Sequence, residues 1–315
     1  MTVSKAKLVE VDEGRAGQRI DNFLLANFTN VPKSRIYRAI RSGEVRVNKG
    51  RVKPVYRVKL GDMVRLPPIS SDQSSDKPRR VPSDLIERLE NQIVYESEHL
   101  LVINKPAGIA VHSGTGDYWG VIEVFRASRE NQPFLELAHR IDKETSGCLV
   151  LAKTRRALLD VQEGLHAKES EKEYVFLTKG DWEVKKHTVT HALEKQANNA
   201  IGSKMIGAES GKEAITIFST KERYKKHTLI SAAIKTGRTH QIRVHAQLEG
   251  HPVAGDKRYG DFEYNRALQK LGLQRMFLHA VYLKLRLVDL SQTLEFRAPL
   301  PDELKNLCKQ LRKGE

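Results

Sequence analysis

The segment HRIDKETSG, residues 139–147, places side chains that could do chemistry directly before a strongly apolar run. Residues 148–152 have the length and continuity of a strand that is buried on both faces. Asp142 therefore lies where the chain enters the core, and residues 145–147 supply turn chemistry between the two parts. A carboxylate at this point could act as a nucleophile, or it could stabilise positive charge that develops on a substrate.

Two other patterns, a set of histidines and a glycine-rich loop, resemble a metal site and a nucleotide site only in part. The chain carries His240, His245, His251 and His279, yet their spacing is not that of a known zinc motif, and no nearby carboxylate or cysteine completes a ligand set. GTGDYWG, which begins at residue 114, lacks the Lys-Ser/Thr pair and the acidic ribose partner of nucleotide-binding loops. Neither a metal nor a nucleotide cofactor is expected.

The elements that must position Asp142 follow from hydrophobic periodicity and from turn residues. Strands outnumber helices and are joined mostly by hairpin-like links, which predicts an α+β domain with a large mixed, mainly antiparallel sheet and flanking helices. The expected elements are a strand over 99–106, a helix capped by Thr154, a strand over 172–180, a hairpin excursion over 185–218, a strand followed by a helix between its N-cap Thr239 and Gly250, a strand pair over 275–300 and a helix over 301–313.

Length and composition set the broad class of the protein. A chain of 315 residues favours two domains and can bury a substantial core without disulfides. Cys148 and Cys308 form no metal-spaced or redox pair, so we expect two structural thiols. No segment has the length of a membrane span, and no apolar leader is visible at the N-terminus, so a cytoplasmic protein is expected.

The formal charge of +15 and the pI near 9.7 indicate a polyanionic partner. The charge is clustered, because residues 33–65 carry eleven Lys or Arg against Glu44 and Asp62, a net charge of +9. The same region reads as two short helices, over 18–28 and 33–42, followed by a hairpin with its turn at 48–50.

This order of elements resembles the S4 RNA-binding domain, from GQRIDNFL to GDMVRLPP. We therefore expect an S4-like domain over 1–66, a proline-rich linker over 67–82 and a second domain over 83–315. Such a surface would hold RNA phosphates by charge. The cations expected to contact RNA are Lys33, Arg35, Arg38, Arg41, Arg46, Lys49, Arg51 and Lys53.

Three stretches together resemble the motifs of the RluA-type pseudouridine synthases: HRIDKETSG at 139, EKEYVFLTKG at 171 and GRTHQIRVHAQLEGHPV at 237. With LLVINKPAGIAVH before the first motif, GDKRYG and RMFLHAVYLKL after the last, and the S4-like domain in front, the resemblance covers nearly the whole chain. The departures are mild: Ile141 replaces the usual Leu, and Lys143 and Glu144 replace a similar pair.

The resemblance implies a pseudouridine synthase fold and the isomerisation of uridine in large-subunit ribosomal RNA, without cofactor or metal, by a monomeric enzyme. It implies that Asp142 acts on the sugar or the base and that Arg243 keeps this carboxylate ionised and aimed. It also implies that Tyr174 stacks on the base and could serve as a general base. Arg140 matches the position that fills the gap in the RNA stack after the base is flipped out.

Two alternatives stay open from the residues alone. The chain could be an S4 protein that binds ribosomal RNA without catalysis, although the trio Asp142, Tyr174 and Arg243 argues against this. It could also be a metal-dependent RNA hydrolase that uses Asp142, although no second convergent carboxylate is apparent for two-metal chemistry.

Overall fold

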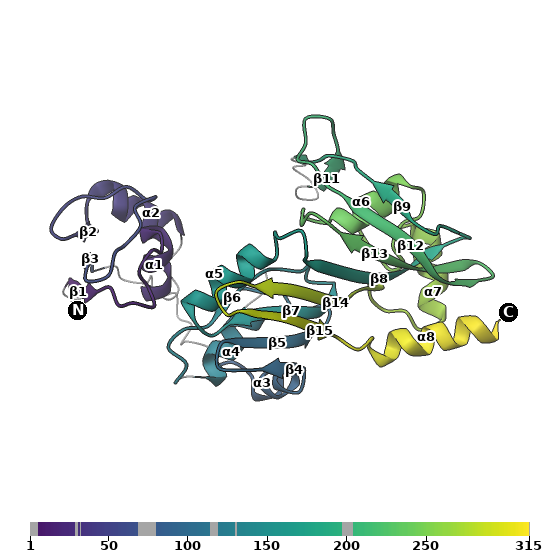
Figure 1. Cartoon of the computed structure of the whole chain (residues 1–315), viewed down its shortest axis with the longest axis horizontal. Helices are drawn as coiled ribbons and strands as arrows, with labels where there is room; N and C mark the ends of the chain where they lie inside the picture. Colours follow the sequence, from purple (N-terminus) through teal and green to yellow (C-terminus); the bar gives the residue numbers. More distant parts are fainter. Residues whose placement is uncertain are drawn as a thin grey trace. The chain divides into compact units, whose positions relative to one another are not determined.

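The protein, represented by a computed structural model, divides into two compact units, Met1–Arg80 and Val81–Glu315 (Figure 1). We call them the N-terminal and the C-terminal unit. The structure describes residues 6–28, 31, 33–68, 80–113, 119–129, 131–196 and 204–314. Within these ranges, no helix is both long enough and apolar enough to span a membrane.

The N-terminal unit packs two helices against a small antiparallel sheet with the strand order β1-β3-β2. Apolar residues at helical spacing form its core, as the periodicity predicts: Ile20, Phe23 and Leu24 on the first helix, and Ile36, Ala39 and Ile40 on the second, are all buried. Its elements are β1 (Lys7–Glu10), α1 (Ile20–Asn27), α2 (Lys33–Ser42), β2 (Arg46–Val47) and β3 (Met63–Leu66).

The predicted hairpin in this unit is shorter than expected. Asn48 and Lys49 both have positive φ, 48° and 69°, so the chain does reverse there in a two-residue turn. Among the described residues, no strand directly follows this turn, because β2 pairs instead with β3, the next strand along the chain, in the register Val47↔Val64. Most of the linker expected at 67–82, namely residues 69–79, lies outside the described ranges.

The C-terminal unit is built on a mixed sheet whose main path runs β4-β5-β7-β14-β8-β13-β12-β9, with β6 beside β7 and β15 beside β14. The β7–β14 pair is parallel, and the other pairs of this sheet are antiparallel. Its strands are β4 (Ile93–Glu96), β5 (Leu100–Lys105), β6 (Glu136–Leu137), β7 (Ser146–Ala152), β8 (Glu171–Lys179), β9 (His187–Val189), β12 (Thr216–Tyr224), β13 (His227–Ile234), β14 (Leu278–Leu287) and β15 (Gln292–Arg297).

Six helices and a separate hairpin accompany this sheet in the described residues. The hairpin joins β10 to β11 within the region predicted as an excursion, 185–218, of which residues 197–203 lie outside the described ranges. The elements are α3 (Ser83–Glu90), α4 (Val121–Ser128), α5 (Arg155–Gly164), α6 (Gln241–Leu248), α7 (Phe262–Lys270), α8 (Asp302–Lys313), β10 (Leu193–Gln196) and β11 (Lys204–Gly207).

Strand β7 is buried along its whole length, as its apolar sequence predicts. Cys148 and Val150 pack with α5 on one face of the sheet, while Leu149 and Leu151 pack with α3 and α4 on the other (Figure 1). Thr154 caps α5 by accepting a hydrogen bond from Ala157 N at 3.2 Å, which confirms the predicted cap. The strand that follows the HRID segment is therefore rigid.

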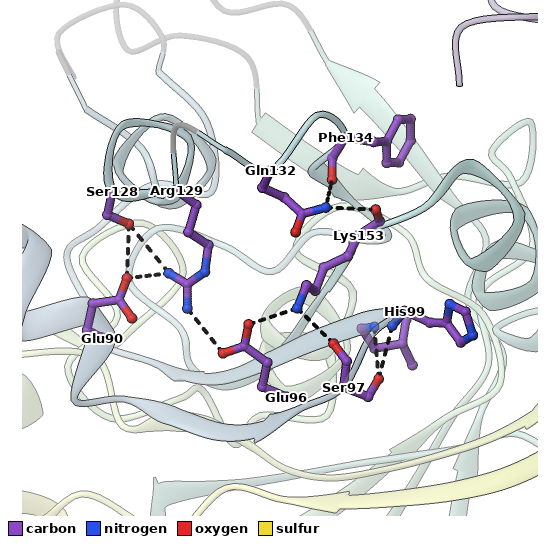
Figure 2. A network of polar contacts seen from close by, with 10 residues as sticks. Glu90, Glu96, Ser97, His99, Ser128, Arg129, Gln132, Phe134 and Lys153 are labelled. Carbon is purple, nitrogen blue, oxygen red and sulfur yellow. Dashed lines mark hydrogen bonds and ion pairs between the residues drawn. The ribbon is translucent and has the colours of Figure 1, made fainter. Parts of the chain in front are cut away.

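A network of charged side chains joins α3 and α4 to β4 and to the end of β7 (Figure 2). Arg129 forms an ion pair with Glu90 and a second one with Glu96 at 3.2 Å, and Lys153 Nζ lies 3.0 Å from Glu96. Burial would raise the pKa of Glu96, but Lys153 and Arg129 outweigh it and lower the pKa. The network thus fixes the helices that cover one face of β5 and β7.

Candidate active site

The HRID segment is held by alternate side chains. The ring of His139 accepts a hydrogen bond from Val150 N at 3.1 Å through Nε2, and burial, together with the charge of Lys172, lowers its pKa to about 4, so it stays a neutral acceptor. Ile141 is buried in the core beside β5 and β7. Arg140 lies between these two buried residues and Asp142 follows them, and both line the pocket described below.

A buried lysine holds the same loop from behind. Lys105 at the end of β5 is fully buried, and its Nζ donates to the carbonyl oxygens of Pro106 at 2.8 Å, Ile109 at 2.8 Å and Lys143 at 3.0 Å. Gly108 N donates to the same Lys143 oxygen at 2.9 Å. Burial, the largest influence, lowers the pKa of Lys105 to about 7. Two donors thereby fix the backbone carbonyl of Lys143, the residue directly after Asp142.

Strand β7 begins earlier than predicted. Ser146 and Gly147 were expected in a turn with Thr145, but they are the first two residues of β7 and pair with His279 and Ala280 of β14. Gly147 has φ 115°, and a Cβ there would lie 2.2 Å from the carbonyl oxygen of Ala280. The glycine is required by close strand approach rather than by a loop.

The carboxylate of Asp142 is paired as predicted. Arg243 Nη1 donates to Asp142 Oδ2 at 2.9 Å. Asp256, which is also buried, receives the two other donors, Arg243 Nε at 2.7 Å and Nη2 at 3.0 Å. The guanidinium is thus clamped on one edge by Asp256 and presents its remaining edge to Asp142.

Charges on both sides keep this arginine ionised. Burial, the largest single influence, would lower the pKa of Arg243, but the hydrogen bonds and charges of Asp256 and Asp142 outweigh it and raise the pKa. Burial would raise the pKa of Asp256, yet Arg243 and the backbone N–H groups of Arg258 and Tyr259 lower it. The Tyr259 ring lies 4.9 Å from Arg243 Cζ and covers the guanidinium face.

Tyr174 lies on β8 between strands β13 and β14, opposite Ala232 and Ala280. The two small neighbours leave the aromatic ring room at the wall of the pocket. Burial and the charge of Asp142 raise the pKa of the Tyr174 hydroxyl, so it is protonated at neutral pH. A stacking contact through the ring is compatible with a neutral hydroxyl, whereas proton abstraction would need the phenolate.

These residues line one pocket of about 90 Å³ in the C-terminal unit. It brings together Arg140, Asp142, Tyr174 and Arg243, the four residues that the motifs nominate. The remaining lining residues are Ile141, Thr145, Ile234, Gly237, Arg238, His240, Gln241, Ile242 and Leu278.

The helix that carries Arg243 starts differently from the prediction. Thr239 was expected to be the N-cap of α6, but His240 takes that position, with φ 56° and without a side-chain cap hydrogen bond. Gly250 follows the last turn with φ 79°, as expected for a residue that ends a helix.

Most of the predicted RNA-contacting cations of the N-terminal unit are exposed. Arg35 is an exception, because its guanidinium pairs with Glu44 at 2.7 Å and lowers the pKa of that carboxyl. The side chain of Lys33 lies outside the described part of the chain. The exposed cations are Arg38, Arg41, Arg46, Lys49, Arg51 and Lys53.

The four histidines considered as metal ligands do not converge. Within the described ranges, no three His, Cys, Asp or Glu side chains are placed to hold a metal ion. Each ring has its own partner: His240 binds Tyr259, His245 binds Thr216, His251 stacks on Trp182, and His279 binds Ser146.

Sequence reasoning missed three residues of the site: Lys105, Asp256 and Tyr259. They lie in two stretches outside the three motifs: Lys105 in NKP, and Asp256 and Tyr259 in GDKRYG. The Gly-Asp pair could have indicated a carboxylate held in a turn. In the structure Gly255 has φ 74°, and Asp256 accepts from Arg258 N and Tyr259 N. Its partner Arg243 lies thirteen residues earlier, on α6, and this pairing needed the fold.

Comparisons with known proteins find similar sequences along nearly the whole chain. Residues 99–248 match the family model described as RNA pseudouridylate synthase, and residues 18–64 match the S4 domain. The chain is 44% identical to the ribosomal large subunit pseudouridine synthase C of Haemophilus influenzae, over 99% of this chain and 97% of the relative. It is 43% identical to the protein of the same name from Escherichia coli K12, over 97% of both chains.

Solved structures give the same result. The human RNA pseudouridylate synthase domain containing 4 protein is similar with a TM-score of 0.59 at 25% identity, over 73% of this chain and 96% of that chain. The human domain containing 1 protein is similar with a TM-score of 0.57, also at 25% identity, over 72% of this chain and 96% of that chain.

Proposed function

This chain belongs to the RNA pseudouridylate synthase family, and on that premise we propose that it converts uridines of large-subunit ribosomal RNA to pseudouridine through Asp142. It is an RNA pseudouridine synthase with an N-terminal S4 domain. We take the ribosomal substrate from the names of the relatives, ribosomal large subunit pseudouridine synthases, which match nearly the full chain. This substrate fits the expected cytoplasmic location.

The observation that carries the proposal is the single pocket carboxylate, which is held by an arginine that a second carboxylate clamps. Asp142 accepts from Arg243, whose other donors are held by Asp256, so the carboxylate is aimed at the pocket before any substrate arrives. Such preorganisation is what a charge-stabilising or nucleophilic group needs.

The reaction breaks the bond between N1 of uracil and C1′ of the sugar and forms a bond between C5 and C1′. A proton leaves C5, and one is gained at N1, so no oxidant or reductant is consumed. Asp142 would act at C1′ or at the base, and Tyr174 would stack on the base while it turns. Arg140, exposed at the pocket, would fill the gap that the flipped nucleotide leaves in the RNA.

The test is single-turnover conversion of a large-subunit RNA fragment by Asp142→Asn, with RNA affinity measured in parallel. We expect loss of product formation with nearly unchanged affinity, because the substitution keeps shape and removes only the acting charge. Product at a rate within tenfold of wild type would remove Asp142 from the chemistry. Turnover that EDTA stops and zinc or magnesium restores would favour a metal-dependent hydrolase instead.

A further inference from the structure

His240 occupies an unusual backbone position in the wall of the pocket. It directly precedes α6 in the left-handed region, φ 56° and ψ 19°, which residues other than glycine seldom adopt. Its side chain is 17% exposed and lies among the pocket-lining residues, three positions before Arg243. A residue held in this conformation at a pocket is a candidate for a functional role.

The hydrogen bonds around His240 favour one tautomer of its ring. Tyr259 Oη accepts from Met205 N at 3.0 Å, and it lies 2.9 Å from His240 Nδ1. With its oxygen occupied by the backbone donor, Tyr259 is placed to donate its own proton to Nδ1. This assignment leaves the proton of the neutral imidazole on Nε2.

The remaining N–H group faces the reaction centre. His240 Nε2 lies 3.8 Å from Asp142 Oδ2, which is too far for a hydrogen bond. Burial, the largest influence, lowers the pKa of His240 even though Asp142 lies near, so the ring is neutral at pH 7. A neutral N–H donor at the pocket wall is therefore left for a group that enters the pocket.

We propose that His240 donates a hydrogen bond from Nε2 to a carbonyl oxygen of the flipped uracil and stabilises the charge that the base acquires as it leaves the sugar. When the N1–C1′ bond breaks, its electron pair stays on N1 and spreads to the uracil oxygens, where a fixed donor is most effective. No proton leaves His240 in this step. The inference rests on the proposed function, since it requires that Asp142 acts on a uridine in this pocket.

Tyr259 is then a positioning residue for both members of the site. Its hydroxyl fixes the tautomer of His240, and its ring covers the guanidinium of Arg243. The β10–β11 hairpin supports it, because Met205 of β11 both bonds its hydroxyl and packs in the same apolar cluster. One tyrosine thus couples the hairpin to the two residues that face Asp142.

The experiment compares single-turnover rates of N1–C1′ bond cleavage, followed as loss of the starting nucleoside, on two RNAs, one with uridine at the target position and one with 5-fluorouridine. Loss of the starting nucleoside is the readout because 5-fluorouridine has no C5 proton to release and does not form pseudouridine. Fluorine at C5 withdraws electrons and makes uracil a better leaving group, which needs less help from a hydrogen bond. We expect His240→Phe to lower the uridine rate about 10²- to 10³-fold, the loss typical of one such donor, and to lower the 5-fluorouridine rate about tenfold less. His240→Gln, which keeps an N–H donor, should recover part of the rate.

Controls separate this role from a structural one. His251→Gln, whose ring stacks on Trp182 outside the pocket, should stay within about twofold of wild type on both RNAs. If His240→Phe does not fold, Tyr259→Phe serves as the test. It removes the hydroxyl that holds the proton of His240 on Nε2, so the rate should fall less than in His240→Phe but with the same difference between the two RNAs. Equal losses on both RNAs by a folded variant overturn the proposal for His240.

Failure of the proposed function would look different. Asp142→Asn should cleave the N1–C1′ bond of neither RNA, and if it does cleave that bond, the proposed function fails whatever His240 does. If Asp142→Asn is inactive while the His240 variants lose the same factor on both RNAs, only the inference about His240 fails.

Discussion

Asp256→Asn tests the clamp that aims Arg243. Asp256 accepts from Nε at 2.7 Å and from Nη2 at 3.0 Å, and both side chains are at least nine-tenths buried. The amide keeps the shape but removes the negative charge, and it turns an N–H group toward a donor. Breaking a buried pair in this way costs about 3 to 5 kcal/mol of unfolding free energy. For a unit of this size, that corresponds to a fall in Tm of about 6 to 20 °C.

The same change should slow the chemistry. Arg243 released from Asp256 no longer presents a fixed Nη1 to Asp142, and a displacement of about 1 Å at a reacting group costs about 10²-fold in rate. We expect this loss in the single-turnover rate, with RNA affinity nearly unchanged. Asp261→Asn is the matched control, because Asp261 caps α7 through Tyr264 N at 2.9 Å. Asparagine caps a helix about as well as aspartate, so this change removes only the exposed ion pair with Lys179 and should alter neither the stability nor the rate by much.

The clamp interpretation is wrong if Asp256→Asn keeps a rate within about threefold of wild type. It is also wrong if its Tm falls no further than that of Asp261→Asn, because a buried charge left without its partner should cost more than a lost exposed ion pair.

Three further predictions concern other parts of the chain. Tyr174→Phe should lose less single-turnover rate than Tyr174→Leu, because the ring rather than the protonated hydroxyl is expected to act; equal losses would assign the function to the hydroxyl. Replacing exposed cations of the N-terminal unit, Arg38, Arg41 and Lys49, by Gln should reduce the slope of log K against log salt by about 0.7 to 0.9 for each lost phosphate contact; an unchanged slope would show that these cations do not touch RNA. Burial lowers the pKa of His139 and His279 to about 4, so the unfolded state binds more protons between pH 4 and 6.5, and the free energy of unfolding should fall as pH falls through that window; a flat profile in equilibrium denaturation would contradict the burial of these rings.

The position of Asp142 could be predicted from the local sequence, whereas the positions of Tyr174 and Arg243 could not. The apolar run after HRIDKETSG could only be a covered strand, and this places Asp142 at its entrance. The positions of Tyr174 and Arg243 followed from the resemblance, and the structure brings both into the pocket with Asp142. What each of them does in the reaction stays a prediction.

The misses depend on contacts between segments that are distant in sequence. Ser146 and Gly147 are polar or small, so they look like turn residues, but both pair with β14, and Gly147 also pairs with Lys105 of β5. Thr239 is the better N-cap by its chemistry, yet α6 begins one residue later, after His240, whose ring contacts Tyr259, twenty residues from Thr239 in the sequence. Arg35 was expected to contact RNA, but in the folded chain Glu44 lies beside it and forms an ion pair with it.

The most direct measurement maps pseudouridines in the large-subunit RNA of cells that lack this protein, before and after the wild-type chain or Asp142→Asn is supplied. The account predicts specific uridines that stay unmodified without the protein, become pseudouridine with the wild-type chain, and stay unmodified with Asp142→Asn at equal protein level. Restored pseudouridine with Asp142→Asn, or an unchanged map in the cells that lack the protein, would contradict it.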